Sequence, residues 1–231
     1  MKCNLIIAVI IPLIIVSGVI VSIVMPAIAN NVIQVAVVDT LGQRYGLGDH
    51  PYVRVDSDDF SFLTGKFKQV YIESPERDFN GIKAQSLVVC ARDVDLDFKT
   101  FILSRRVKVR RIGKVSSRMI FGEDELNRYV SSRYPDSSLR MDLCANKITG
   151  KAGVEMIGDM EVLFKPRLRG DHMVLEPVDA KFSCAKMMNL DNARNWVKEI
   201  SLDLPVSNLP FGLRIAKISV MNNELMVVAE N

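Results

Sequence analysis

The N-terminal part of the chain has no charged residue between Lys2 and Asp39, which leaves an uncharged stretch of 36 residues. Within it, residues 5–29 are almost entirely Leu, Ile, Val, Ala and Met. As a helix, this segment would extend about 37 Å at ~1.5 Å per residue, enough to cross a hydrocarbon layer of about 30 Å. We therefore expect a membrane helix or an export signal, followed by a separate folded body.

Two interpretations of residues 1–29 compete. The small-x-small sequence at 27–29 resembles a signal-peptide cleavage site, whereas the apolar run exceeds the ~7–15 residues usual for a signal-peptide core. We favour an uncleaved transmembrane signal anchor. Lys2 and the α-amino group flank the N-terminal side, and positive charge is retained in the cytoplasm. We therefore expect a single pass through the cell membrane with residues 30–231 extracytoplasmic, or secretion to the envelope if the chain is cleaved after Ala29.

Residues 30–231 are expected to form one domain. The whole chain is 48% hydrophobic and 25% charged, with 13 glycines, 9 prolines and a formal net charge of +3. This composition excludes a disordered or collagen-like chain. The length suits a single domain, and no linker or internal repeat divides it.

The spacing of apolar residues predicts an α+β fold of mostly antiparallel strands, with three helices after the anchor. Apolar and polar residues alternate, as on half-buried strands, at 70–72, 93–98 and 107–110. Apolar residues recur at helical spacing in 30–45, 123–134 and 190–200. The C-terminus is expected to be a hairpin that turns at Asn222-Asn223, because asparagine tolerates positive φ.

Acidic residues recur along one predicted strand without forming a recognisable metal site. Asp93, Asp95 and Asp97 have the spacing that opens a calcium loop, but Phe98 and Ser104 stand where that loop needs Gly and Glu. We interpret the three carboxylates as a solvated strand face. No metal ion or other cofactor is expected.

The sequence also lacks the combinations that common catalytic sites require. The two histidines, His50 and His172, stand alone, and there is no G-x-S-x-G sequence and no Walker loop. We therefore expect no enzyme, although a hydrolase with paired carboxylates stays open as an alternative. The cysteines beyond the anchor are odd in number and lack C-x-x-C spacing, so we expect small buried side chains, with one disulfide as the alternative. They are Cys90, Cys144 and Cys184.

The most uneven charge in the chain is a basic run at 105–118, which has seven cations and no acid. On a strand, three of these cations share one face, opposite Val107 and Val109. That face could meet anionic headgroups or a membrane surface, at about 1 kcal/mol per cation. A merely solvated basic strand is the alternative. Nucleic acid is not an expected partner, because the domain is exported and no aromatic residues are interleaved. The three cations are Arg106, Lys108 and Arg110.

Two stretches of the chain carry a family resemblance. They are residues 60–74 (FSFLTGKFKQVYIES) and residues 209–220 (LPFGLRIAKISV). Together with the order of elements over residues 32–230, they resemble the LmeA-like phospholipid-binding proteins of bacteria. The resemblance implies lipid binding outside the cytoplasm, in a long curved antiparallel sheet packed with helices, similar to the tubular lipid-binding (TULIP-like) superfamily. The family offers no catalytic positions to transfer to this chain.

A curved sheet with a partly covered apolar face would leave a groove for acyl chains, whose burial is favourable by ~0.8 kcal/mol per methylene. We therefore expect a membrane-anchored phospholipid-binding protein, and lipid transfer and envelope biogenesis are the roles open to it. A non-lipid envelope scaffold or interaction module is the main alternative, and ordinary core packing is the alternative role for each groove candidate. The groove candidates are Val70, Ile72, Val94, Leu96, Phe98, Val107 and Val109.

Overall fold

The computed structural model describes residues 51–57, 61–97, 100, 103, 108–135, 138–154, 158–170, 172–183, 201–206, 209 and 212–231. The N-terminal segment 1–29, its boundary with the following domain, and the helices expected over 30–45 and 190–200 lie outside these residues. Among the described residues, no helix combines the length and the apolar character needed to span a bilayer.

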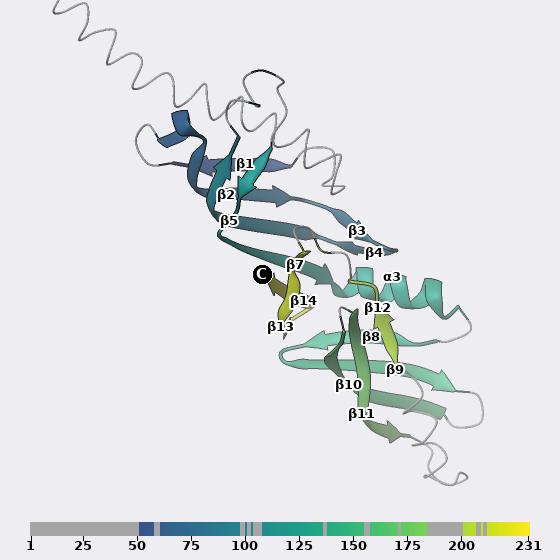
Figure 1. Ribbon diagram of the computed structural model, residues 1–231. Coiled ribbons are helices and arrows are strands. Elements are labelled where there is room, and N and C mark those ends of the chain that lie inside the picture. The colour runs from purple at the N-terminus through teal and green to yellow at the C-terminus, as the bar shows by residue number, and fades with distance from the viewer. Residues whose placement is uncertain are drawn as a thin grey trace, which may run out of the picture.

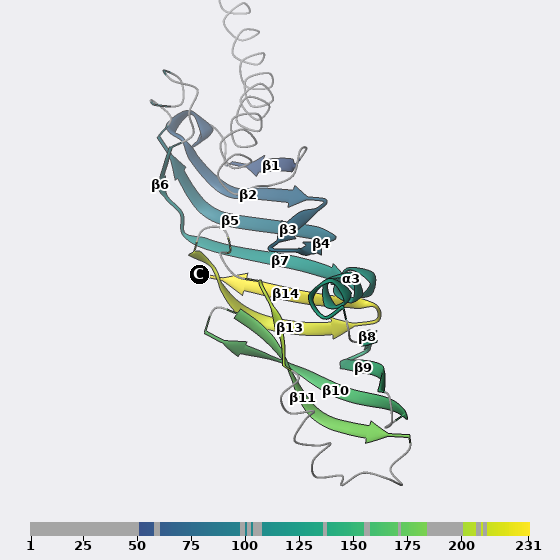
Figure 2. The ribbon, with the colours of Figure 1, turned by 90° about the vertical axis from the view of Figure 1, so that its right-hand side faces the viewer.

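Antiparallel pairing builds a long sheet from the two ends of the described chain. Its strands lie in the order β1-β2-β5-β7-β14-β13, and the short strand β6 also pairs with β5. Figure 2 shows β2, β5 and β7 curving along their length. The strands are β1 (Tyr52–Asp56), β2 (Lys66–Ser74), β5 (Ser86–Leu96), β6 (Val109–Arg111), β7 (Lys114–Gly122), β13 (Arg214–Met221) and β14 (Glu224–Glu230).

A second antiparallel sheet lies beyond this long sheet (Figure 1), in the order β12-β11-β10-β9-β8. The family resemblance implied one long curved sheet packed with helices, whereas the structure has two larger sheets and the small hairpin of β3 (Arg77–Phe79) and β4 (Ile82–Ala84). The strands of the second sheet are β8 (Arg140–Cys144), β9 (Lys147–Val154), β10 (Gly158–Arg169), β11 (His172–Phe182) and β12 (Leu202–Leu204).

Alternating side chains of the long strands form the core, as a period of two requires. In β7, Val115, Met119 and Phe121 are buried while the residues between them are more exposed, apart from the buried Ser117. The β3–β4 hairpin packs on this layer, with the ring of Phe79 edge-on to Phe121 at 6.0 Å between centroids. The expected α+β class with mainly antiparallel strands is confirmed for the described residues.

The helix expected over 123–134 is confirmed as α3 (Glu123–Arg133), and Leu126 and Val130 form its buried stripe. Three acidic residues occupy its first turn, where the helix dipole favours negative charge. Tyr129 attaches the helix to the second sheet, because its hydroxyl donates to the carbonyl of Asp203 at 2.9 Å. Pro135 follows the helix and prevents its continuation.

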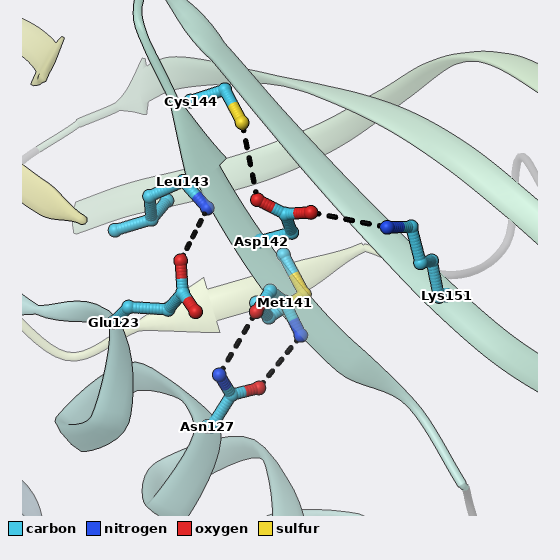
Figure 3. Close-up of polar contacts among 7 residues, drawn as sticks. All are labelled: Glu123, Asn127, Met141, Asp142, Leu143, Cys144 and Lys151. Atoms are coloured by element: carbon cyan, nitrogen blue, oxygen red, sulfur yellow. Dashed lines mark hydrogen bonds and ion pairs between the residues drawn. The ribbon is translucent and has the colours of Figure 1, made fainter. Parts of the chain in front are cut away.

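Side chains of α3 cover the outer edge of β8 (Figure 3). The amide of Asn127 accepts from the Met141 N–H at 2.6 Å and donates to the Met141 carbonyl at 2.9 Å. One turn earlier, Glu123 Oε2 accepts from the Leu143 N–H at 2.8 Å. β8 is an edge strand of the second sheet, and the helix supplies hydrogen-bond partners for backbone groups on its outer edge.

The predicted C-terminal hairpin is confirmed, and Asn223 has the positive φ that the turn needs, at 62°. Turn-to-turn contacts connect this hairpin to β8–β9. The N–H of Asn146 donates to the Val220 carbonyl at 3.1 Å, and the N–H of Asn223 donates to the Leu143 carbonyl at 2.8 Å. The two sheets are thus joined by hydrogen bonds at their turns.

Candidate functional site

Four of the groove candidates lie in the hydrophobic core. Val70, Ile72, Val94 and Leu96 are 7, 3, 5 and 6% exposed, on the adjacent strands β2 and β5. Val109 differs, since it lies on the wholly exposed strand β6 and is 39% exposed. Phe98 and Val107 lie outside the described residues. The sequence pattern therefore identified an apolar layer across β2 and β5, while β6 lies outside that layer.

The described part of the basic run extends from β6, which pairs with β5, into β7, which contains Lys114 and Arg118. Lys108 and Arg110 are both exposed, and Arg110 forms an ion pair with Asp97 at 2.9 Å. The hydroxyl and N–H of Thr100 also donate to the Asp97 carboxylate. These two donors, followed by Arg110, hold the pKa of Asp97 below its ordinary value. Arg106 lies outside the described residues.

A pocket of about 400 Å³ opens where β2 begins and β5 ends. We name it the β2–β5–β6 pocket. It combines three cationic side chains, two carboxylates and a serine with two apolar residues. Its lining consists of Ser61, Lys66, Phe67, Lys68, Asp93, Val94, Asp95 and Arg111.

The pocket coincides with an irregularity in β5. Asp93 has a φ of 52°, and Arg92 and Asp93 are both exposed, so the in-and-out alternation is interrupted. The N–H of Gly113 approaches the carbonyls of both residues at 3.1 and 3.2 Å. A Cβ at Gly113 would lie 2.9 Å from the Asp93 Cβ, so this close approach requires glycine. This irregularity is a β-bulge at Asp93. It brings Asp93 and Asp95 of β5 into the same pocket as Lys66 and Lys68 of β2 and Arg111 of β6.

Charge in the pocket is arranged across three strands. Asp95 is the register partner of Lys66 on β2 and of Arg111 on β6. Nevertheless, none of the ion pairs among the described residues involves Asp95, and its Oδ1 atom is buried without a hydrogen bond. Three cations and two carboxylates leave a formal charge of +1 on the lining. The pocket can therefore accept a group that carries negative charge and hydrogen-bond donors together.

The sequence patterns did not single out Lys66 and Lys68, because two lysines separated by one residue are an ordinary feature of an exposed strand face. Arg111 was counted only as a member of the basic run. Asp93 and Asp95 were interpreted as a solvated face, whereas the structure places them in the wall of the pocket. Only the pairing of β2, β5 and β6 brings these residues together.

Arg77 is a second charged residue that has no polar partner among the described residues. It lies at the base of the β3–β4 hairpin, where its guanidinium stacks on the Phe79 ring at 4.9 Å. Its Nη1 atom is buried and makes no hydrogen bond, and burial lowers the pKa of the guanidinium.

The cysteines differ from the expectation of buried thiols. Cys144 ends β8 on the exposed phase of that strand, so for this residue the expectation was wrong, and Cys90 is half-buried. Both are free thiols, and Cys184 lies outside the described residues. The Cys144 thiol donates to Asp142, which also binds Lys151 (Figure 3). This hydrogen bond and the Asp142 charge raise the pKa of Cys144, which disfavours a nucleophilic thiolate.

Within the described ranges, no group of three or more His, Cys, Asp and Glu side chains is arranged to hold a metal ion. Comparison with known families is more informative. The family model described as LmeA-like phospholipid-binding matches residues 24–230, which is nearly the whole chain.

The chain belongs to this family. The resemblance seen in residues 60–74 and 209–220 is thereby confirmed. No curated protein and no solved structure matches the chain.

One of the two family-like stretches lines the β2–β5–β6 pocket. Residues 61–74 of the family-like segment fold into η1 (Ser61–Thr64) and β2, and they supply Ser61, Lys66, Phe67 and Lys68 to the pocket. The stretch that carries the resemblance is therefore also the stretch that forms one wall of the site.

Proposed function

We propose that this protein is a membrane-anchored, extracytoplasmic phospholipid-binding protein whose β2–β5–β6 pocket holds the phosphate-bearing headgroup. Family membership supports phospholipid as the ligand. The observation that carries the location is the convergence of Lys66, Lys68 and Arg111 on one pocket of about 400 Å³. Cationic side chains are suited to phosphate, and a pocket at the lower end of the range for small-molecule sites suits a headgroup better than a whole lipid.

The acyl chains would leave the pocket beside the apolar layer of β2 and β5. Val94 lines the pocket and is also part of the core, so the headgroup site and the apolar layer meet at this residue. Because Val70, Ile72, Val94 and Leu96 are buried in the core, the chains would reach them only by displacing neighbouring core side chains, and each buried methylene would contribute about 0.8 kcal/mol. The exposed Val109 on β6 is then a lipid-facing position.

The apolar N-terminal segment and the basic strand would hold the domain at a membrane. Residues 5–29 are long enough to span the bilayer, and Lys2 favours a cytoplasmic N-terminus. Arg106, Lys108 and Arg110 would then lie near anionic headgroups, where each cation adds about 1 kcal/mol. This placement suits a protein that takes up lipid from the bilayer for transfer or envelope biogenesis, without making or breaking a bond.

The headgroup site is tested with the full chain, purified in a non-ionic detergent. Native mass spectrometry and organic extraction measure the phospholipid that remains bound to the wild type and to the triple variant Lys66→Gln, Lys68→Gln, Arg111→Gln. We expect stoichiometric phospholipid on the wild type and a loss of at least about tenfold in the triple variant, since hydrogen bonds to charged groups contribute ~1.5–3 kcal/mol each.

A charge-matched control distinguishes the effect of the pocket residues from the effect of lowering the net charge of the protein. Lys83, Lys165 and Lys217 are exposed on β4, β10 and β13, away from the pocket lining. Their triple substitution by Gln removes the same three charges and should leave the bound lipid unchanged. Equal lipid occupancy in both triple variants would contradict the location of the site, and a wild type that neither carries nor takes up lipid would contradict the function.

A further inference from the structure

We infer that the β2–β5–β6 pocket selects a headgroup that carries a primary ammonium group beside its phosphate, as an ethanolamine phospholipid does. This inference rests on the proposed function and specifies its ligand. The phosphate would bind Lys66, Lys68 and Arg111, and the ammonium would bind the carboxylate of Asp95, with Asp93 adding negative charge to the same wall.

The uncompensated carboxylate of Asp95 is the first argument. Cations flank it on both neighbouring strands, yet it forms no ion pair and accepts no hydrogen bond at Oδ1 within the described part of the chain. A buried carboxylate oxygen without a donor is costly, and native proteins rarely leave one without a partner. A ligand that donates N–H groups to this carboxylate would remove the deficit.

The spacing of the strands is the second argument. Adjacent strands lie about 4.7–4.9 Å apart, and directly opposed Cβ atoms are about 4.5–5.5 Å apart. Asp95 therefore lies one strand spacing from Lys66 on one side and from Arg111 on the other. With bond lengths near 1.5 Å, a two-carbon linker places the nitrogen roughly 4–5 Å from the phosphorus. Such a headgroup can reach a cation and the carboxylate at the same time.

The lining also disfavours the two other common headgroup classes. A choline group has no N–H to donate and is usually recognised by aromatic faces. The only aromatic residue among the described lining residues, Phe67, is 2% exposed and packs in the core. An anionic headgroup without an amine would bring its charge close to two carboxylates, and like charges in a binding site are unfavourable.

The test compares three short-chain lipids that differ only in the headgroup. The full chain in a non-ionic detergent is titrated with dihexanoyl phosphatidylethanolamine, phosphatidylcholine and phosphatidylglycerol, and native mass spectrometry gives the dissociation constants. We expect the ethanolamine lipid to bind the wild type about tenfold more tightly than the choline lipid, as a charge-assisted hydrogen bond would provide. Equal affinities for the three lipids would overturn the inference.

The isosteric variant Asp95→Asn tests the residue itself. It should bind the ethanolamine and choline lipids equally and the glycerol lipid more tightly than the wild type does. Asp159→Asn makes the same chemical change on an exposed β10 residue outside this pocket and should keep the wild-type preference. A preference that persists in Asp95→Asn would overturn the assignment of Asp95. The wild-type comparison needs no variant and stands even if Asp95→Asn folds poorly.

Failure of this inference is distinguishable from failure of the proposed function. If the triple variant at Lys66, Lys68 and Arg111 loses all lipids while Asp95→Asn keeps its preference, the headgroup site stands and only the ammonium contact is refuted. Competition with soluble phosphoethanolamine distinguishes the lipid from its free headgroup as the ligand. It should compete weakly with the ethanolamine lipid, and a free headgroup that binds as tightly as the lipid would refute the lipid as the source.

Discussion

The side-chain amide of Asn127 binds the backbone of Met141 through both its oxygen and its nitrogen, at 2.6 and 2.9 Å, as a neighbouring strand would. Met141 is 2% exposed, so water cannot easily replace these bonds. One asparagine on a helix therefore supplies the pairing that the edge strand β8 lacks.

Substitution Asn127→Ala removes both bonds and leaves a part-buried N–H and C=O of Met141 without partners. We expect the free energy of unfolding to fall by about 2 kcal/mol, because each lost bond contributes ~1 kcal/mol or more when its partner stays buried. Urea unfolding followed by circular dichroism measures this change. Ser132→Ala, on the exposed face of the same helix, should change the stability by less than about 0.5 kcal/mol. A similar small effect at Asn127 would show that this pairing contributes little.

Two glycines of β9 form a matched pair. A Cβ at Gly150 would lie 2.7 Å from Phe164 Cε2 and 2.9 Å from Leu139 Cδ1, whereas one at Gly153 would lie 3.7 Å from Ser138 Oγ. We expect Gly150→Ala to destabilise the fold by about 1–3 kcal/mol through overpacking, while Gly153→Ala should be neutral or slightly stabilising. Thermal unfolding of the two variants compares them directly, and equal melting temperatures would contradict this packing.

Arg77 offers a test of an unpartnered cation. Its Nη1 atom is buried without an acceptor, so the folded state bears a desolvation cost that no ion pair offsets. We expect Arg77→Met, which keeps an apolar chain over the Phe79 ring, to leave the stability unchanged or raise it by about 1 kcal/mol. Arg77→Ala also loses that stacking and should be the less stable of the two. A large loss of stability in Arg77→Met would reveal a favourable role for the charge.

The exposed thiol of Cys144 gives a prediction that depends on pH. The hydrogen bond to Asp142 and the charge of that residue raise the pKa of the thiol, so the thiolate fraction at pH 8 is lower than for an unperturbed cysteine. Asp142→Asn removes the negative charge, lowers the pKa of Cys144 and should increase the rate of alkylation by iodoacetamide at pH 8. The rate is measured with Cys3, Cys90 and Cys184 replaced by serine. The two proteins should react at the same rate well above both pKa values, and an unchanged rate at pH 8 would contradict the coupling.

The proposed membrane-surface role of the basic run is tested with a label at Leu103, which is 76% exposed and precedes this run. An environment-sensitive fluorophore on Leu103→Cys, in a chain free of other cysteines, reports proximity to lipid in nanodiscs. We expect a blue shift with anionic lipids that is reversed by salt and by joint replacement of Arg106, Lys108 and Arg110 with Glu. A blue shift that persists in that Glu variant would show that these three cations do not bring Leu103 close to the membrane.

Periodicity identified the elements that local sequence determines. The stripe of Leu126 and Val130 predicted α3, the asparagine pair predicted the C-terminal turn, and alternating apolar residues predicted β2 and β5. These features depend on neighbours within a few residues, which a sequence displays directly. The division into two sheets was not predicted, because it depends on pairings between strands far apart in the chain, such as that of β7 with β14.

The candidate site was predicted only in part for a similar reason. The basic run and the acids at 93–97 are visible in the sequence, but their meeting with Lys66 depends on the register of β2 with β5 and of β5 with β6. The Asp93 bulge shifts that register, and no local pattern marked it. Val109 was expected beside the apolar layer because it alternates with Lys108 and Arg110, yet the three-residue strand β6 lies at the sheet margin and is exposed throughout.

The place of β14 in the long sheet sets a limit on when the protein can fold. This strand lies between β7 and β13, and Phe121 and Met119 of β7 have Leu225 and Val227 as their register partners. The whole second sheet lies between these partners in the sequence. A chain made from its N-terminus must therefore keep one edge of β7 unpaired until residues 224–230 have been added, so the long sheet is completed late in synthesis, after the strands of the second sheet have been made.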